Sequence, residues 1–478
     1  MSKKRVLAFV HGWSVTHTDT YGGLPEALQQ QAAAAGLEIE VKDLWLGRYI
    51  SFHDEVTLDD LARAMQHAIT QDLGAPASFS CITHSTGGPV VRRWVDRYYG
   101  PRNLGDCPLR HLLMLAPANH GSALAVIGKS RLGRIKSWFG GVEPGQGVLD
   151  WLCLGSDGAC DLADRTTRHQ ARGTRYWPCV LSGETVDNKF YDFLNSYLVE
   201  KGSDGVVRLA AANMNYTYFR LDQRGDELIE GHFGKAHALA VRPGLAARPD
   251  PSPFFVIPGA SHSGEDIGIM RSVKPGNVAR KPVVEQLLRC LKVDSPAEYD
   301  RLLEEAATFT EETQRAHANS QYGGVLRRFV MLVFRIRDDE GRVISDYDLF
   351  LLGKGFEPDT LPKGFFVDKQ KNEKSHALVY YLDYEQLRKV DEMGFHIHAR
   401  PHFGAPGTER PDVFAGYTRA EFRLGREQFE RYIRPNETVY VDITLRRTVD
   451  AEALRFEPAS DGKKSFKRQS PGGEVVDV

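Results

Sequence analysis

The chain carries the stretch Phe79-Ser80-Cys81-Ile82-Thr83-His84-Ser85-Thr86-Gly87-Gly88, and this stretch decides the fold of its N-terminal part. An apolar run ends at a serine with small residues after it, and a helix-like stretch follows at Val90 to Tyr99. Strand, sharp turn and helix in this order are typical of a nucleophile elbow, which presents a serine hydroxyl at the carboxyl edge of a sheet. Thr83 stands where the usual G-x-S-x-G pattern has glycine, so we expect crowding on that side of the turn.

Around this stretch, short apolar runs alternate with helix-like stretches over residues 1–293. The runs are Val6–Val10, Leu37–Val41, Ser78–Thr83, His111–Ala116, Trp177–Ser182 and Phe254–Ile257. The alternation predicts an α/β domain with a mostly parallel sheet covered by helices on both faces. Two long connections, residues 119–176 and 206–253, are predicted to be lid or cap insertions.

Within the first connection, residues 123–139 place apolar and basic side chains on different arcs of a predicted helix. Two interpretations stay open. The helix packs on its own domain, or it is a lid that contacts an anionic lipid surface.

The sequence changes character near residue 294. Residues 294–324 begin with Ser295-Pro296-Ala297-Glu298, which indicates a capped acidic helix that connects two domains. Over residues 325–458 the apolar period falls to two, which predicts a separate antiparallel β domain, sandwich-like in form. The tail, residues 459–478, is rich in lysine, serine and glycine and is predicted to be disordered.

Composition excludes several classes of protein. The 478 residues carry 61 Lys and Arg against 63 Asp and Glu, a net charge of −2, so a general basic surface for nucleic acid is absent and we expect no nucleic-acid partner. The first apolar run is shorter than the roughly 7 to 15 residues of a signal peptide, and no run reaches the about 18 of a spanning helix. We therefore expect a protein made in the cytosol.

The six cysteines are too scattered for a disulfide framework and contain no C-x-x-C pair. We predict buried thiols. A pairing among Cys153, Cys160 and Cys179 stays open for an oxidising compartment.

A serine nucleophile of this kind needs an acid and then a histidine, each in a loop after a later strand. Asp204 and His262 occur in that order and in such loops, so we predict that Ser85, Asp204 and His262 form a catalytic triad. The backbone amides of Trp13, after the first strand, and Thr86 are predicted to form the oxyanion hole. The reserve candidates for the acid are Asp222, Asp226 and Asp266.

Taken together, residues 1–293 resemble the bacterial lipase branch of the α/β hydrolases. The resemblance rests on His11-Gly12, on Thr83 to Gly88, on Ala116-Pro117-Ala118-Asn119-His120-Gly121-Ser122, on Asp204-Gly205, and on His262 ahead of Gly268-Ile269. Within that branch, the added β domain and the segment from Leu113 to Lys136 are most similar to type VI secretion lipase effectors.

The resemblance implies a lipase or phospholipase that cleaves acyl esters through an acyl-serine, without a metal or an organic cofactor. It also implies an antibacterial effector delivered into a target cell, with a secretion-apparatus or immunity protein as partner. Two alternatives stay open. One is a hydrolase of another acyl bond, a thioester or an amide, and the other is a non-catalytic module whose β domain binds a partner.

A further cluster is His396, His398 and His402, since alternate residues of a strand share one face. Three imidazoles could bind a metal, but no acidic or thiolate partner stands at a convincing spacing, which favours a solvated strand face.

Overall fold

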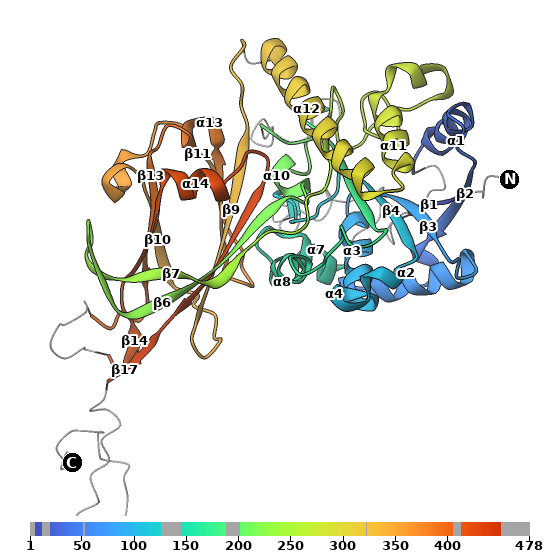
Figure 1. Ribbon diagram of the computed structural model, residues 1–478. Helices are drawn as coiled ribbons and strands as arrows, with labels where there is room; N and C mark the ends of the chain where they lie inside the picture. Colours follow the sequence, from blue (N-terminus) through green and yellow to red (C-terminus); the bar gives the residue numbers. More distant parts are fainter. Residues whose placement is uncertain are drawn as a thin grey trace, which may run out of the picture.

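The computed structural model describes residues 5–11, 20–50, 53–125, 145–187, 201–321, 323–404 and 413–450. Two large sheets lie side by side (Figure 1). The first has six strands in the order β2-β1-β3-β4-β5-β8, all parallel: β1 (Arg5–His11), β2 (Ile39–Trp45), β3 (Phe79–His84), β4 (Leu109–Leu115), β5 (Trp177–Gly183) and β8 (Phe254–Ile257). The expected parallel sheet is confirmed.

Helices cover both faces of this sheet because successive apolar side chains along each strand point to opposite faces, so both faces are apolar. Leu7 and Phe9 of β1 belong to a core cluster with α1 (Leu24–Ala34), α11 (Pro282–Lys292) and α12 (Pro296–Gln321). Ala8 and Val10 belong to the cluster on the other face. The helices of that face are α2 (Leu58–Asp72), α3 (Gly87–Tyr98), α7 (Gln146–Leu152) and α8 (Asp157–Thr166), with the short α4 (Gly100–Asn103) after α3.

The second sheet has nine strands in the order β10-β13-β15-β7-β6-β16-β9-β12-β11. Its strands are β6 (Tyr216–Gly231), β7 (Gly234–Ala247), β9 (Phe329–Asp338), β10 (Tyr347–Leu352), β11 (Phe366–Lys371), β12 (Leu378–Asp383), β13 (Glu392–Ala399), β15 (Ala420–Gly425) and β16 (Thr438–Leu445). Small elements complete this half: α13 (Tyr384–Leu387), α14 (Arg426–Tyr432), and β14 (Ala415–Tyr417) paired with β17 (Arg447–Val449).

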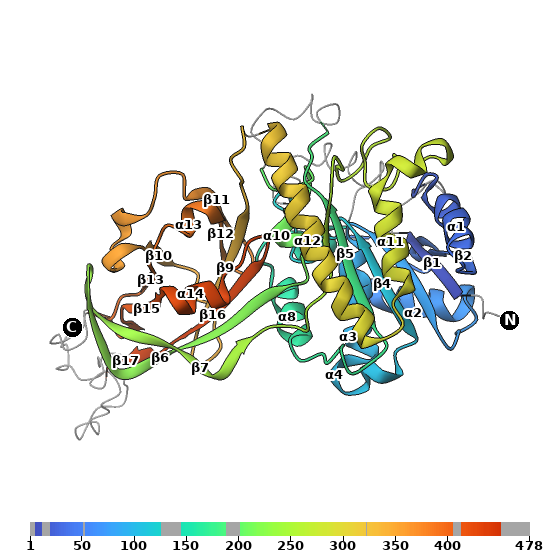
Figure 2. The same cartoon turned by 45° about the horizontal axis from the view of Figure 1, so that its top comes forward.

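This sheet corrects two expectations. It is one mixed sheet, since β16 runs parallel to both β6 and β9, and so the antiparallel sandwich predicted for residues 325–458 was wrong. The connection 206–253 is no lid, because most of it forms the β6–β7 hairpin in the middle of this sheet. Figure 2 shows the hairpin leaving the six-stranded half and crossing to the other. Its length suggested an insertion, whereas its pairing partners lie far along the chain.

The first predicted lid, residues 119–176, is only partly within the described residues, and residues 126–144, which include most of the proposed lipid-contacting helix, lie outside them. The rest contains α7 and α8, and most of the buried residues of these two helices belong to the core cluster that includes α2 and α3. Among the described residues, no helix is both long and apolar enough to cross a membrane. The predicted tail, residues 459–478, also lies outside the described part. All six cysteines are free, and five of them are buried.

The two sheets share one core. The cluster that contains α2 and α3 continues through Met331, Val333, Val379 and Tyr440 of the nine-stranded sheet, whose other face encloses a cluster of its own. The C-terminal strands are therefore packed against the first sheet's helices and are no detached module.

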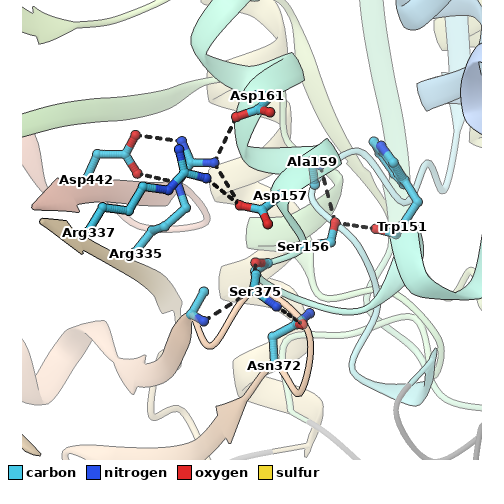
Figure 3. Close-up of polar contacts among 12 residues, drawn as sticks. Trp151, Ser156, Asp157, Ala159, Asp161, Arg335, Arg337, Asn372, Ser375 and Asp442 are labelled. Atoms are coloured by element: carbon cyan, nitrogen blue, oxygen red, sulfur yellow. Dashed lines mark hydrogen bonds and ion pairs between the residues drawn. The ribbon is translucent and has the colours of Figure 1, made fainter. Parts of the chain in front are cut away.

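A buried arginine fastens α8 to the nine-stranded sheet (Figure 3). The Arg335 guanidinium of β9, 5% exposed, donates two hydrogen bonds of 2.7 Å to Asp442 of β16. It also donates to Asp161 at 2.8 Å and to Asp157 at 3.1 Å, both on α8. Arg337 adds a bond of 2.8 Å to Asp157. We call these five residues the Arg335 cluster.

We expect Arg335→Met to lower the free energy of unfolding by about 3 kcal/mol, because Asp442, whose side chain is 25% exposed, would lose the cation that compensates its partial burial. Arg335→Met with Asp442→Leu should recover most of this loss, since no uncompensated charge stays buried. Urea denaturation measures both. Arg342→Met is the control, because Arg342 is 62% exposed and pairs with a half-exposed Glu340. An Arg335→Met change as small as that of the control would contradict the prediction.

Candidate active site

Ser85 occupies a strained turn between β3 and α3. Its φ of +53° lies in the left-handed region, which non-glycine residues rarely adopt. The turn is held by backbone bonds, since Ser85 N–H donates to Leu115 O at 3.0 Å and Ser85 O accepts from Gly88 at 3.2 Å and Ala118 at 3.3 Å. The strain and the bonds that hold it are those of a nucleophile elbow.

The turn accommodates Thr83 because glycines follow it. Thr83 is fully buried, and a Cβ added to Gly87 would lie 3.2 Å from the Thr83 Cβ. A Cβ on Gly88 would lie 2.7 Å from the Pro117 Cβ. The missing side chains at these two positions leave the space that Thr83 and the loop after β4 occupy, so the expected crowding is relieved.

The three residues predicted as a triad meet at the carboxyl edge of the first sheet. His262 Nε2 lies 3.0 Å from Ser85 Oγ, and His262 Nδ1 lies 2.9 Å from Asp204 Oδ2. The side chains of His262 and Asp204 are 2% and 0% exposed, while Ser85 is half-buried. With Nδ1 donating to the carboxylate, Nε2 is left to accept the serine proton, the arrangement that a general base requires.

Asp204 is oriented by its own loop. Its Oδ1 accepts from Val206 N–H at 2.9 Å and Val207 N–H at 2.7 Å, which leaves Oδ2 for His262. The loop after β4 supports this turn, because Ser122 Oγ donates to Val206 O at 2.6 Å. One of the reserve acids is engaged elsewhere, because the Asp222 carboxylate pairs with Arg242 on the hairpin. For Asp266, the backbone carbonyl accepts a hydrogen bond from Lys281 at 3.4 Å. The Asp226 side chain lies outside the described part.

His84 contacts the loop that carries His262, and the sequence analysis did not predict this contact. Its Nε2 lies 2.9 Å from the backbone carbonyl of His262, and its ring lies 4.7 Å from the His262 ring. Burial, and then the neighbouring His262, lower the pKa of His84 to about 3, so it is a neutral donor at working pH. His84 ends β3 and directly precedes Ser85, but nothing near it in the sequence indicates a contact with the loop that carries His262.

Of the two predicted oxyanion donors, the structure describes one. Thr86 directly precedes α3, so its N–H stands at the N-terminal end of that helix, where the backbone dipoles favour negative charge. Trp13 lies outside the described residues and stays a prediction. His11, at the end of β1, stacks on Trp45 at 3.7 Å and contacts Asp43 through Nε2 at 2.8 Å.

The histidine cluster on the nine-stranded sheet has an acidic partner that its spacing did not reveal. His396 Nδ1 lies 3.0 Å from Glu421 Oε2 of the neighbouring strand, both buried. His398 and His402 instead contact each other, at 4.3 Å between ring centres. The described residues contain no group of three or more His, Cys, Asp or Glu side chains that could hold a metal ion.

A buried carboxyl, Glu184, follows β5 directly and lies next to the segment that carries His262. Thr185 N–H donates to Ala260 O at 3.1 Å, and Glu184 Oε2 accepts from Gln314 of α12 at 3.3 Å. Gln314 in turn accepts from Asn436 at 2.9 Å. Burial raises the pKa of Glu184 to about 7, although the Gln314 hydrogen bond opposes this.

Because its folded pKa exceeds the value of 4.5 expected when unfolded, Glu184 should reduce stability as the pH rises from 4.5 to 7. We expect Glu184→Gln to exceed the wild type in free energy of unfolding by about 2 to 3 kcal/mol at pH 8 and by under about 1 kcal/mol at pH 5. Urea denaturation at the two pH values measures this, with the exposed Glu311→Gln as control. An equal difference at both pH values would contradict the assignment.

Comparisons with known proteins show which solved structures this chain is similar to. No family model matches the chain, and no curated protein does. The solved structure of phospholipase PlaB from Legionella pneumophila is 40% identical, with a TM-score of 0.83 over 99% of this chain and 100% of that one. The same phospholipase in complex with thio-NAD is 39% identical, with a TM-score of 0.82 over the same shares. Bacillus licheniformis lipase BlEst2 is 19% identical, with a TM-score of 0.33 over 45% of this chain and 80% of that one.

Proposed function

The chain belongs to the family of the Legionella pneumophila phospholipase PlaB, and from that premise we propose that it hydrolyses the acyl esters of phospholipids through Ser85, His262 and Asp204. The chain is an ester hydrolase, like the phospholipase PlaB to which it is 40% identical. The observation that supports these residues is the unbroken chain of hydrogen bonds from Ser85 Oγ through His262 to Asp204.

The proposed reaction has two halves. His262 Nε2 takes the Ser85 proton as the hydroxyl attacks the ester carbonyl, and then gives it to the leaving alcohol, which leaves an acyl-serine. A water molecule, deprotonated by the same nitrogen, then releases the fatty acid. Asp204 holds the imidazole in the required tautomer and stabilises its charged form, and the Thr86 amide stabilises the oxyanion together with the amide expected at Trp13.

The finer expectations remain proposals. A type VI effector role, with delivery into a target cell and a secretion or immunity partner, rests on the sequence resemblance alone. A lipid contact through the first connection concerns residues 126–144, which lie outside the described part. The alternative of a thioester or amide substrate stays open as well, because the serine, histidine and aspartate do not by themselves select the leaving group.

Fatty-acid release from mixed phospholipid vesicles tests the proposal. We expect the wild type to release fatty acid and Ser85→Ala to release none above background, with the products separated by head group and acyl position to define the bond cut. Cleavage of a short soluble ester without any release from vesicles would retain the serine mechanism and overturn the lipid assignment. Selective cleavage of thioesters or amides would favour the alternative.

A further inference from the structure

The loop that carries Asp204 rests on the nine-stranded sheet. Residues 201–209 form a closed loop, because Leu209 N–H donates to Gly202 O at 2.9 Å and Ser203 pairs with Arg208 as a β-bridge. α10 (Leu209–Ala212) follows, and Figure 1 shows it between the two sheets. Thr438 of β16 donates to its Ala210 carbonyl at 2.7 Å. The loop is therefore fixed at both its base and its exit.

Gly202, at the start of the 201–209 loop, shows how closely this loop approaches the nine-stranded sheet. Its φ is +68°, and a Cβ there would lie 2.3 Å from the Phe329 ring and 2.7 Å from the Tyr381 hydroxyl. Tyr381, on β12, donates through that hydroxyl toward the carbonyls of Lys201 at 3.0 Å and Gly202 at 3.2 Å. A residue of the C-terminal part thus bonds the backbone two residues ahead of Asp204.

Arg208, near the end of the 201–209 loop, is held by a cation–π contact and an ion pair. The Arg208 side chain is 1% exposed, and its guanidinium lies 4.2 Å from the centre of the Tyr381 ring. It also pairs with Asp368 of β11, the edge strand beside β12. Arg208 is consequently fixed by a ring and a carboxylate that both belong to the nine-stranded sheet.

We propose that Tyr381, Arg208 and Asp368, here named the acid-loop clamp, are positioning residues that hold Asp204 Oδ2 against His262 Nδ1. The inference rests on the proposed function, since it assigns the clamp a role in the same reaction. His262 N–H already holds the Asp204 carbonyl at 3.0 Å, and Ser122 holds the Val206 carbonyl at 2.6 Å. The clamp fixes the start of the same loop from the side of the nine-stranded sheet, and a misplacement of the carboxylate by about 1 Å can cost on the order of 100-fold in rate. The clamp gives the C-terminal part a role in catalysis without contact with the substrate.

Tyr381→Phe tests the clamp, with Tyr380→Phe as a matched control. Tyr380 is the neighbouring residue on β12, is also buried and also donates to a backbone carbonyl, that of Leu349 at 2.9 Å, but it faces the other core cluster. On a short soluble ester, with active sites titrated, we expect Tyr381→Phe to lower kcat about 10-fold with little change in KM, and Tyr380→Phe to leave both near the wild type. Similar denaturation midpoints for the two variants would separate this effect from stability.

A second pair of variants keeps the test decisive. Asp368→Asn should also lower kcat, and Tyr381→Phe combined with Asp204→Asn should be no slower than Asp204→Asn alone, because the clamp acts through Asp204. Equal kcat values for Tyr381→Phe and Tyr380→Phe, or additive losses in the double variant, would overturn the inference.

The outcomes also separate the two proposals. If Asp204→Asn loses activity while Tyr381→Phe and Asp368→Asn keep a normal kcat, the clamp is overturned and the proposed function is retained. If Tyr381→Phe and Asp368→Asn lower kcat on the soluble ester but the wild type releases no fatty acid from vesicles, the lipid assignment is overturned and the clamp is retained. Unchanged activity in Asp204→Asn overturns the clamp together with the proposed triad.

Discussion

Ser85→Ala is expected to lower kcat by about 10⁶-fold while leaving KM nearly unchanged, because the substrate would still bind but no acyl-serine could form. The rate that persists should be the one that the oxyanion donors and binding alone provide. Steady-state hydrolysis of a short soluble ester, followed long enough to quantify slow turnover, measures the loss. Denaturation of the variant checks that the fold is intact.

Ser80→Ala is a matched control for this substitution. Ser80 lies on β3, the strand that leads into the turn at Ser85. Its Oγ is 2.8 Å from His111 Nδ1, so it too is a serine in contact with a histidine. His111 Nε2 lies 2.8 Å from the Val293 carbonyl oxygen, and burial lowers the pKa of His111 to about 4. This pair is closed to solvent and has no carboxylate behind the ring, so we expect its loss to affect stability and to change kcat less than about threefold. Comparable losses in the two variants would contradict the assignment of Ser85.

Asp204→Asn is expected to lower kcat by about 10⁴-fold. The amides of Val206 and Val207 hold the oxygen of the new amide at the Oδ1 position, which turns its NH₂ group toward His262 Nδ1. Nδ1 would then have to accept, so the ring proton would move to Nε2 and Nε2 could no longer take the Ser85 proton. The variant should remain folded, because the shape and the loop bonds are kept.

The measurement is again hydrolysis of a soluble ester, with Asp222→Asn as the control. Asp222 pairs with Arg242 on the hairpin surface and should tolerate the change. The Ser85→Ala and Asp204→Asn double variant should be about as slow as Ser85→Ala alone, since residues that act as a unit are not additive. Near-normal turnover in Asp204→Asn would remove Asp204 from the proposed triad.

The choice of the three residues was accessible from sequence because each signal is local. Ser85 stands in a strand, turn and helix pattern, and Asp204 and His262 follow in the required chain order. The carboxyl ends of parallel strands share one edge, so the pattern also predicts that the three meet. The structure brings them within hydrogen-bond distance.

The supporting contacts were not accessible in this way. His84 reaches a carbonyl of a loop far along the chain, and nothing in its own neighbourhood marks that contact. The partner of His396 was missed for the same reason, because Glu421 lies on another strand. Spacing along the chain says little about pairs that only sheet register brings together.

By itself, the sequence determined the parallel sheet, the turn at Ser85 and the choice of candidate residues for the proposed triad, because apolar periodicity and turn residues act over a few positions. Only the tertiary structure decided that the β6–β7 hairpin joins the C-terminal strands and that Tyr381 and Arg208 fix the Asp204 loop. Those outcomes depend on which strands pair and on which faces share a core. They are set by burial summed over the whole molecule, which no single stretch of the chain encodes.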